Sequence, residues 1–403
     1  MHIGEPRELL HETDEPGRAT FLELFFDLVY VFALTQISAR MIDDLSFDKG
    51  ALRRIVASEL AESLLLLLAL WFLWSAVAWT TSRYDPRSLV IQALVVVALF
   101  GSMVMAVALP RAFSDQAQVF ATAYVITRMS GPAILALALR GLERRRLKLR
   151  MLSWLGLAAV PWIAGSLVEG IPRGSLWTAA LAIEYLAGRF GWPVPGLGRS
   201  LTPQWEIAGH HLAERYQQFF LIALGESILV IGLTFSSGGF SLGRTVAFVV
   251  AIAATVLVWR IYFYRAGQVL ASAIAASPHP GRAGRSAADT HLVMVIGVVI
   301  MSVGNELDID HAYTHTEPIW TGAILAGPAL FLAARARFEY EVFGRVSTAR
   351  IVGLVALVGL FPLLFSGALL EVALGEAAVL TGVAVADARR AKGAPPEAPK
   401  PPL

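Results

Sequence analysis

Three stretches of this sequence contain no charged residue over lengths that can cross a lipid bilayer. They are Ser88–Leu109, Met151–Val168 and Ile351–Leu370. A helix needs roughly 20 mainly apolar residues to span hydrocarbon about 30 Å thick. Because lipid offers no hydrogen bonds, a spanning segment must satisfy its own backbone, which a helix does. We therefore predict an all-α protein, a polytopic membrane helix bundle whose partner is the lipid bilayer.

Composition supports this class and excludes several others. Hydrophobic residues make up 56% of the chain and charged residues 16%, against roughly 25% charged in a soluble domain. Cysteine is absent, which excludes disulfides and thiolate chemistry, and the net charge of +2 argues against a nucleic-acid partner. The sequence has no phosphate-binding glycine loop with its lysine, no zincin helix and no Gly-x-Ser-x-Gly elbow. We expect no enzyme of these kinds, no cofactor and no metal.

Apolar windows predict about twelve transmembrane helices in two halves. The windows are 21–42, 56–80, 88–109, 117–139, 150–168, 174–188, 212–234, 243–264, 288–305, 318–335, 350–370 and 372–388. The predicted organisation is a polar cytoplasmic N-terminal segment at 1–20, a first half at 21–188, a connecting loop at 189–211, a second half at 212–390 and a disordered Pro-rich tail at 391–403. Counts of ten or eleven spans stay open, because the sixth, ninth and twelfth windows are short or carry an acid.

The distribution of basic residues predicts a cytoplasmic N-terminus. With twelve spans, the arginine-rich loop that includes Arg144, Arg145 and Arg146 lies inside, together with most other lysines and arginines. Basic residues in short loops resist translocation, whereas acids matter little. The acidic segment from Glu306 to Glu317 then falls in an outer loop.

A weak internal repeat appears when Glu23 is aligned with Glu214. The segment Glu23–Asp27 then overlies Glu214–Gln218, and an apolar stretch follows in both. Two six-helix halves would place equivalent helices in the same orientation, as in parallel transporter repeats. The alternative is chance similarity between two apolar helices.

The first predicted span carries acids inside an otherwise apolar sequence. Glu23, Asp27 and Tyr30 lie within about 60° of one another on a helix and form one polar stripe, and Gln36 is a further polar residue of this span. A charged residue at the bilayer centre costs roughly 2.5–3.5 kcal/mol on insertion scales, so these side chains should face protein or a wet cavity. Alternatively, the two acids lie at the cytoplasmic interface, where the helix dipole favours negative charge.

The seventh predicted span repeats this pattern. Glu226 lies about 18 Å beyond the helix start, near the bilayer midplane, where an acid requires an internal partner. Gly225 and Gly232 are predicted to allow a neighbouring helix to approach closely. The other candidate pathway residues on this span are Glu214, Gln218 and Ser227.

Further polar residues occupy other spans. Glu59 and Glu62 share one face of the second span, Arg128 is central in the fourth, Glu184 is in the sixth and Arg260 is late in the eighth. For Arg128, the candidate counter-ions are Asp27, Glu59, Glu62 and Glu226. A membrane-embedded ion-pair network is expected, with either a functional or a purely structural role.

Three segments resemble a known family. The segment Glu23–Gln36, together with His211–Arg215 and Leu224–Ile228, is similar to the bacterial low-temperature-requirement protein A family, over about residues 15–390. The resemblance implies a multi-pass protein of the bacterial cytoplasmic membrane and no particular activity. Tyr216–Gln218 departs from the pattern.

Three functions stay open. The leading hypothesis is a transporter or ion-translocating protein in which Asp27 and Glu226 take up protons or cations, with an unidentified small ion or solute as its substrate. The second is a non-transporting sensor, scaffold or bilayer-adaptation factor whose acids serve helix packing. The third is an intramembrane lipid-modifying enzyme using His210, His211 and Glu214. Substrate, coupling ion and oligomeric state are left open.

Overall fold

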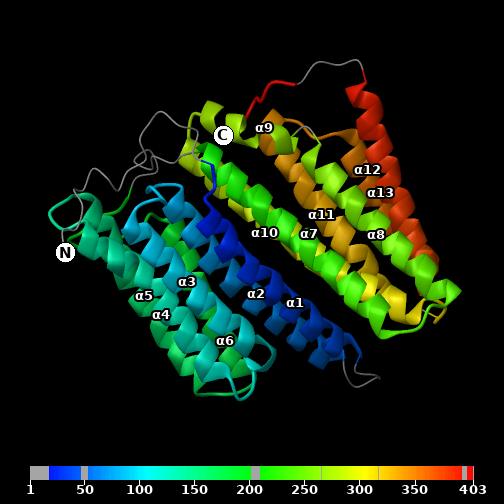
Figure 1. Ribbon diagram of the computed structural model, residues 1–403, viewed down its shortest axis with the longest axis horizontal. Coiled ribbons are helices and arrows are strands. Elements are labelled where there is room, and N and C mark those ends of the chain that lie inside the picture. The colour runs from blue at the N-terminus through cyan, green and yellow to red at the C-terminus, as the bar shows by residue number, and fades with distance from the viewer. Residues whose placement is uncertain are drawn as a thin grey trace. The chain divides into compact units, whose positions relative to one another are not determined.

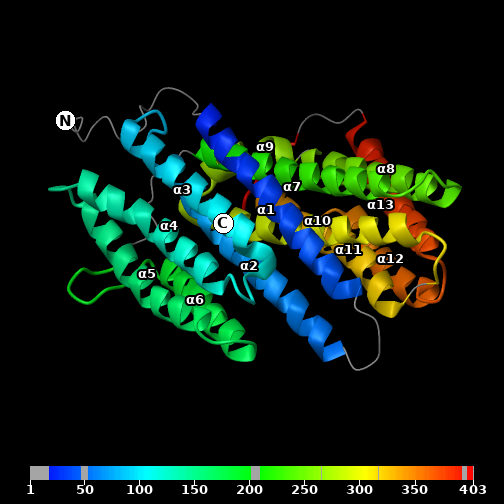
Figure 2. The ribbon, with the colours of Figure 1, turned by 60° about the horizontal axis from the view of Figure 1, so that its bottom comes forward.

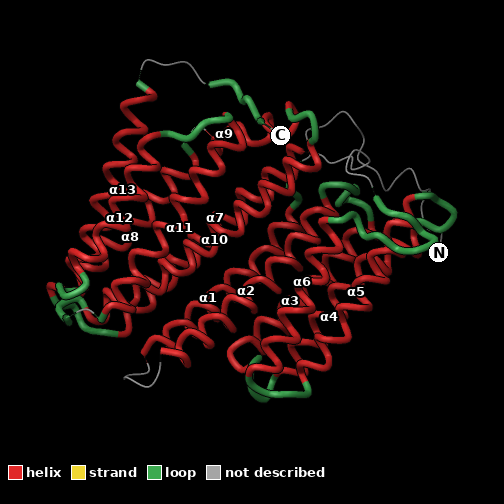
Figure 3. The backbone as a smooth tube through the Cα atoms, turned by 180° about the vertical axis from the view of Figure 1, so that it is seen from behind, coloured by secondary structure: helices red, strands yellow, loops and turns green. Residues whose placement is uncertain are grey.

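The computed structural model describes residues 18–46, 53–200, 209–264, 266–315, 317–392 and 397–402. These residues form thirteen α-helices and a short 3-10 helix, and no strand occurs among them (Figure 3). The elements are α1 (Phe21–Ser46), α2 (Arg53–Thr81), α3 (Leu89–Ala108), η1 (Leu109–Arg111), α4 (Ala117–Ala138), α5 (Arg144–Ser166), α6 (Ile171–Arg189), α7 (Gly209–Ser237), α8 (Leu242–Phe263), α9 (Ala266–Ala276), α10 (Pro280–His311), α11 (Pro318–Phe343), α12 (Thr348–Leu364) and α13 (Leu369–Ala391).

The all-helical prediction is confirmed for the described residues. Among the described residues, ten helices are long and apolar enough to cross a membrane, namely α1–α5, α7, α8, α10, α11 and α13. Helix α12 is apolar but shorter, and α6 lies outside this set. Each of the twelve predicted windows falls on a helix, and α9 is a helix that the windows missed. The number of spans, the orientation and the two-fold repeat stay predictions.

The chain divides into two compact units. The first contains residues 1–37 and 53–212, and the second contains residues 38–52 and 213–403. Helices α1 and α7 therefore each contribute residues to both units.

In the first unit, consecutive helices from α3 to α6 pack side by side (Figures 1 and 2). Aromatic side chains fill the space between α4, α5 and α6. Trp162 lies 4.5 Å from Tyr124 and 5.2 Å from Trp177 between ring centroids, and all three are fully buried. Gly165 makes room for this cluster, because a Cβ there would lie 2.6 Å from Trp177.

In the second unit, the closest helix pair is α10 and α11. A Cβ on Gly297 would lie 2.8 Å from the carbonyl oxygen of Gly327, and a Cβ on Gly327 would lie 2.6 Å from the Met301 nitrogen. Membrane helices use small residues in this way because packing, rather than hydrophobic burial, drives their association. Helices α8, α12 and α13 make further contacts with this pair and among themselves, and the unit also includes α9 and α7 from Ala213 onwards.

Gly225 and Gly232, the glycines predicted to allow close helix packing, are not among those that do so in the structure, and that prediction is wrong. A Cβ on Gly225 or Gly232 would meet no described atom within 4 Å, and both glycines lie on the exposed face of α7.

Part of the C-terminal tail lies against the end of α11. Glu397 pairs with Arg345 at 2.6 Å, and the Lys400 nitrogen donates to the Val342 carbonyl oxygen at 2.8 Å. Residues 393–396 and 403 lie outside the described residues, and the disorder of the tail at 391–403 stays a prediction.

Candidate functional site

The central feature of the second unit is the carboxyl group of Glu226 on α7, which is fully buried. Ser38 on α1 donates to Oε1 at 2.7 Å, and Ser302 on α10 donates to Oε2 at 2.9 Å. Glu226 lies about 25 Å from the start of α7 and about 16 Å from its end, well inside the span. The predicted burial of Glu226 is therefore confirmed, and its partners come from two other helices.

No described cation forms an ion pair with Glu226. An ionised carboxylate there would carry a charge that only two hydroxyl dipoles offset. A proton or a small bound cation would remove that charge, so the group is chemically suited to bind and release one.

Ser302 can make two alternative hydrogen bonds. Its hydroxyl lies 2.9 Å from Glu226 Oε2 and 3.2 Å from the carbonyl oxygen of Val298, one turn earlier on α10. A hydroxyl has a single proton to donate, so Ser302 can turn from one acceptor to the other when the charge on Glu226 changes.

Other acids extend from Glu226 towards the end of α10. Glu306 is partly buried and close enough to Glu226 for the two carboxyls to interact electrostatically. Asp43 on α1 and Asp310 on α10 interact electrostatically with Glu306. Asp310 is exposed and pairs with Arg244 at 2.6 Å. The prediction of an outer loop here is wrong at its start, because α10 continues to His311 and carries Glu306 and Asp310 on its last turns.

In the first unit, Asp27 is the buried acid of α1. It is fully buried and accepts a hydrogen bond from Trp74 Nε1 on α2 at 2.8 Å. One turn later, the Tyr30 hydroxyl lies 3.1 Å from the Ser102 hydroxyl on α3. The predicted polar stripe therefore faces neighbouring helices and not lipid.

Glu23 has a structural role that the sequence analysis did not identify. Its Oε2 accepts from the Thr20 nitrogen at 2.9 Å while the Thr20 hydroxyl accepts from the Glu23 nitrogen at 3.4 Å. This reciprocal arrangement is a capping box at the start of α1. His211 Nε2 lies 3.3 Å from the same carboxyl, and His211 Nδ1 lies 2.9 Å from the Ser82 hydroxyl.

Arg128 has a partner outside the predicted set of counter-ions. Its Nε donates to Glu184 Oε2 at 2.9 Å, and the Tyr124 hydroxyl donates to the same oxygen at 3.1 Å. The expectation that Asp27, Glu59, Glu62 or Glu226 would pair with Arg128 is wrong, because Arg128 on α4 faces Glu184 on α6.

The remaining predicted residues lie in less specific surroundings. Gln36, Glu59 and Glu62 are partly buried. On α7, Gln218 Nε2 donates to Glu214 Oε1 at 3.3 Å, and Ser227 lies 3.5 Å from Thr255 between hydroxyl oxygens. His210 is exposed while His211 is fully buried, so these adjacent histidines do not share one surface.

A buried charge network that was not predicted from the sequence lies where α8, α11, α12 and α13 meet. Arg350 pairs with Asp387 at 2.6 Å and lies 3.8 Å from Glu339. Arg335 donates to the backbone carbonyl oxygens of Ile261 and Tyr264 at 3.1 and 2.7 Å. Charged residues at the ends of predicted spans were the available signal, but an interfacial position explains such residues equally well.

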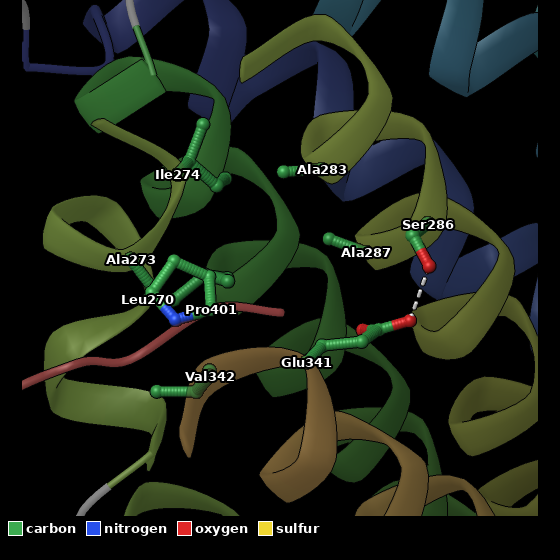
Figure 4. Close-up of a pocket in the computed structure, with 9 residues that line it drawn as sticks. All are labelled: Leu270, Ala273, Ile274, Ala283, Ser286, Ala287, Glu341, Val342 and Pro401. Carbon is green, nitrogen blue, oxygen red and sulfur yellow. Dashed lines mark hydrogen bonds between the residues drawn. The ribbon is translucent and has the colours of Figure 1, made fainter. Parts of the chain in front are cut away.

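A small pocket lies near the end of α11 in the second unit. It is lined mostly by apolar side chains of α9 and α10, together with Glu341, Val342 and Pro401 (Figure 4). Glu341 points to Ser286, which donates to it at 2.5 Å. Thr290 donates to the same oxygen at 2.8 Å. None of the predicted pathway residues lines this pocket.

Comparison with known proteins gives two matches. Residues 18–386 match the family model described as bacterial low temperature requirement A protein. A protein of Rhizobium meliloti (strain 1021), named only "Uncharacterized protein RA0937", is 34% identical over 328 residues. That alignment covers 81% of this chain and 78% of the relative. No solved structure matches.

Proposed function

Since this chain belongs to the bacterial low temperature requirement A protein family, we propose that it is a proton- or cation-coupled transporter in which Glu226 takes up the coupling ion. The family assignment brings no chemistry with it, so the argument rests on the site itself. The proposed setting is the bacterial cytoplasmic membrane, with a cytoplasmic N-terminus and two six-helix halves.

One observation carries the proposal. Glu226 is a fully buried carboxyl inside an apolar span, and no described cation pairs with it. Glu184 is buried to a similar degree, but Arg128 balances its charge at 2.9 Å. A paired acid is explained by structure, whereas an unpaired acid needs a proton or an ion from solution. Intramembrane acids of this kind mark ion pathways in pumps and transporters.

Two features around Glu226 support exchange with solution. Ser302 has a second acceptor within reach, so its hydrogen bond can change with the charge state of Glu226. The acids Glu306 and Asp310 follow Ser302 at successive turns of α10 and reach its exposed end. Such a series attracts cations and can pass protons through intervening water.

Asp27 is the proposed second carboxyl. It is as buried as Glu226 but has an indole donor, Trp74, instead of two hydroxyls. We assign it to the equivalent helix of the first half, because aligning Glu23–Asp27 with Glu214–Gln218 pairs the first span with the seventh, although Asp27 itself aligns with Gln218.

The test is flux in proteoliposomes that contain the purified full chain. In one set of vesicles, a trapped pH dye follows proton entry that is driven by a membrane potential. In a second set, a sodium gradient is the driving force instead. We expect Glu226→Gln to abolish flux, because an amide cannot release a proton or a charge-compensating cation. We expect Ser302→Ala to slow flux, and Asp27→Asn to reduce it.

Glu317→Gln is the matched control, because Glu317 is an exposed acid and loses the same charge. It should retain full flux. Full activity in both Asp27→Asn and Glu226→Gln would refute the proposal. If wild-type vesicles show no flux above empty vesicles while both variants melt at lower temperature, the acids serve helix packing and the non-transporting alternative holds.

A further inference from the structure

A second group of unpaired acids lies on a different face of α10. Asp308 on α10 and Glu376 on α13 are 1% and 3% exposed, and no described cation pairs with either. The helices that carry these two carboxyls, α10 and α13, contact each other. Ser302 and Glu306 of the same helix interact with Glu226 instead.

The register of α10 against α11 locates Asp308. Gly297, Met301 and Gly304 form the stripe of α10 that touches α11, and Asp308 follows at the next position of that stripe. Gly304 lies opposite Ile324, and Met301 lies opposite Gly327, so the helices are antiparallel. By this register, Asp308 is level with the start of α11, where Thr321 is fully buried.

The start of α13 is tied to the end of α10. The Leu370 nitrogen donates to the Ala312 carbonyl oxygen at 3.1 Å, and the Leu369 nitrogen donates to that of Thr314 at 3.3 Å. From this junction, Asp308 lies about 6 Å back along α10 and Glu376 about 9 Å along α13. The two carboxyls are therefore at similar depth, and α10, α11 and α13 contact one another around them.

Several polar atoms of these helices lack hydrogen-bond partners among the described residues. They are both carboxylate oxygens of Asp308, Oε1 of Glu376, Nδ2 of Asn305 and Oγ1 of Thr321. Asn305 is one turn before Asp308 on the same side of α10. Buried polar groups are normally satisfied, so this concentration of unsatisfied atoms requires an explanation.

The chemistry of the four side chains selects a class of ligand. Their unpartnered oxygens are carboxylate and hydroxyl oxygens, with no imidazole or thiolate, and the Asn305 amide nitrogen can donate a hydrogen bond to a carboxylate beside it. No group of three or more His, Cys, Asp or Glu among the described residues is arranged to hold a metal ion, so neutral oxygens must complete any site here. Hard cations such as Ca²⁺ and Mg²⁺ prefer oxygen ligands, and one divalent cation balances two carboxylates.

We propose that Asp308 and Glu376, with the hydroxyl oxygen of Thr321, bind one hard divalent cation that ties α10, α11 and α13 together. This inference does not rest on the proposed transport function. It predicts that the cation stabilises the fold whether or not the protein transports anything.

The first experiment is thermal unfolding of the full chain in lipid nanodiscs after removal of divalent ions with a chelator. Millimolar Ca²⁺ or Mg²⁺ should raise the Tm by about 2–4 °C or more, because a ligand that binds only the folded state stabilises it. Sodium or potassium chloride at equal ionic strength should leave the Tm unchanged. Asp308→Asn and Glu376→Gln should each lose the response, and Glu317→Gln should keep it.

The second experiment needs no variant of the acids. Trp320 lies beside Thr321 in the chain, so Tb³⁺ bound at the site should emit when tryptophan is excited, and Ca²⁺ should displace it. Trp320→Phe should reduce this emission by several-fold. The proposal is overturned if divalent ions leave the wild-type Tm unchanged, if Asp308→Asn responds like wild type, or if the emission is insensitive to Trp320→Phe.

Discussion

Removing one member of the Arg128–Glu184 pair should strongly destabilise the first unit. The Arg128 Nε and Glu184 Oε2 atoms are 2.9 Å apart, and the two side chains are only 10% and 2% exposed. At this separation the attraction is about 6 kcal/mol for an effective dielectric constant of about 20. The cost of desolvating the two groups offsets much of this attraction. Replacing only one residue of the pair, however, leaves an uncompensated buried charge, which costs about 3–5 kcal/mol. We expect this loss in Arg128→Leu and in Glu184→Leu.

The double variant distinguishes the buried charge from lost packing. Arg128→Leu with Glu184→Leu leaves no unbalanced charge and should recover to within about 1 kcal/mol of the wild type, apart from the lost Tyr124 hydrogen bond. The coupling energy of the cycle should then exceed about 2 kcal/mol. Reversible unfolding in mixed detergent micelles measures each free energy through tryptophan fluorescence, since Trp162 lies 4.5 Å from Tyr124.

Arg111 and Asp115 provide the matched control. Their ion pair has the same 2.9 Å separation, but the side chains are 61% and 59% exposed. Water screens such a pair, so removing either member should change stability by about 1 kcal/mol or less. The reasoning is refuted if Glu184→Leu is as mild as Asp115→Leu, or if the double variant loses as much as the sum of its single changes.

Two further predictions concern packing and hydrogen bonding. Gly327→Ala should lower the Tm markedly, because the added Cβ would lie 2.6 Å from the Met301 nitrogen, whereas Gly225→Ala should be neutral since that Cβ meets no described atom within 4 Å. Equal effects of the two substitutions in the same unfolding assay would contradict the close packing of α10 and α11. Trp74→Phe should cost about 1–3 kcal/mol, because it removes the indole donor to the buried Asp27 carboxyl. Asp27→Asn in the Trp74→Phe background should recover part of that loss, and no recovery would show that the hydrogen bond matters little.

The helices were predictable because lipid leaves the backbone few choices. A long apolar run in this sequence can only be a helix, so each apolar window coincides with one. Helix α9 was missed because its 11 residues are too few to span a bilayer, and span length was the signal used. The predicted windows also ended too early, as in α10, because polar last turns such as those carrying Glu306 and Asp310 extend beyond the apolar stretch.

The candidate site was predictable in part. The position of Glu226 deep in an apolar span was enough to predict burial, because the cost of exposing an acid to lipid depends on depth alone. Its partners could not be predicted: Ser38 is 188 residues away and Ser302 is 76 residues away along the chain. Serine is common in apolar helices, so no local signal identifies the two that meet Glu226. The same limit explains why Glu184 was not recognised as the partner of Arg128.

The buried acids divide into two groups by how their charge is balanced. Glu184 and Asp387 each lie against an arginine, at 2.9 and 2.6 Å, so the protein itself holds the compensating charge. Glu226, Asp308 and Glu376 have no such cation among the described residues. Hydroxyl and amide groups can join helices without a net charge, so packing alone does not require a carboxyl at these three positions. The free energy of unfolding should therefore fall when a paired acid is neutralised, because its arginine is then left unbalanced. It should hold steady or rise when an unpaired acid is neutralised without added divalent cation, and ion flux or the cation response should be lost instead.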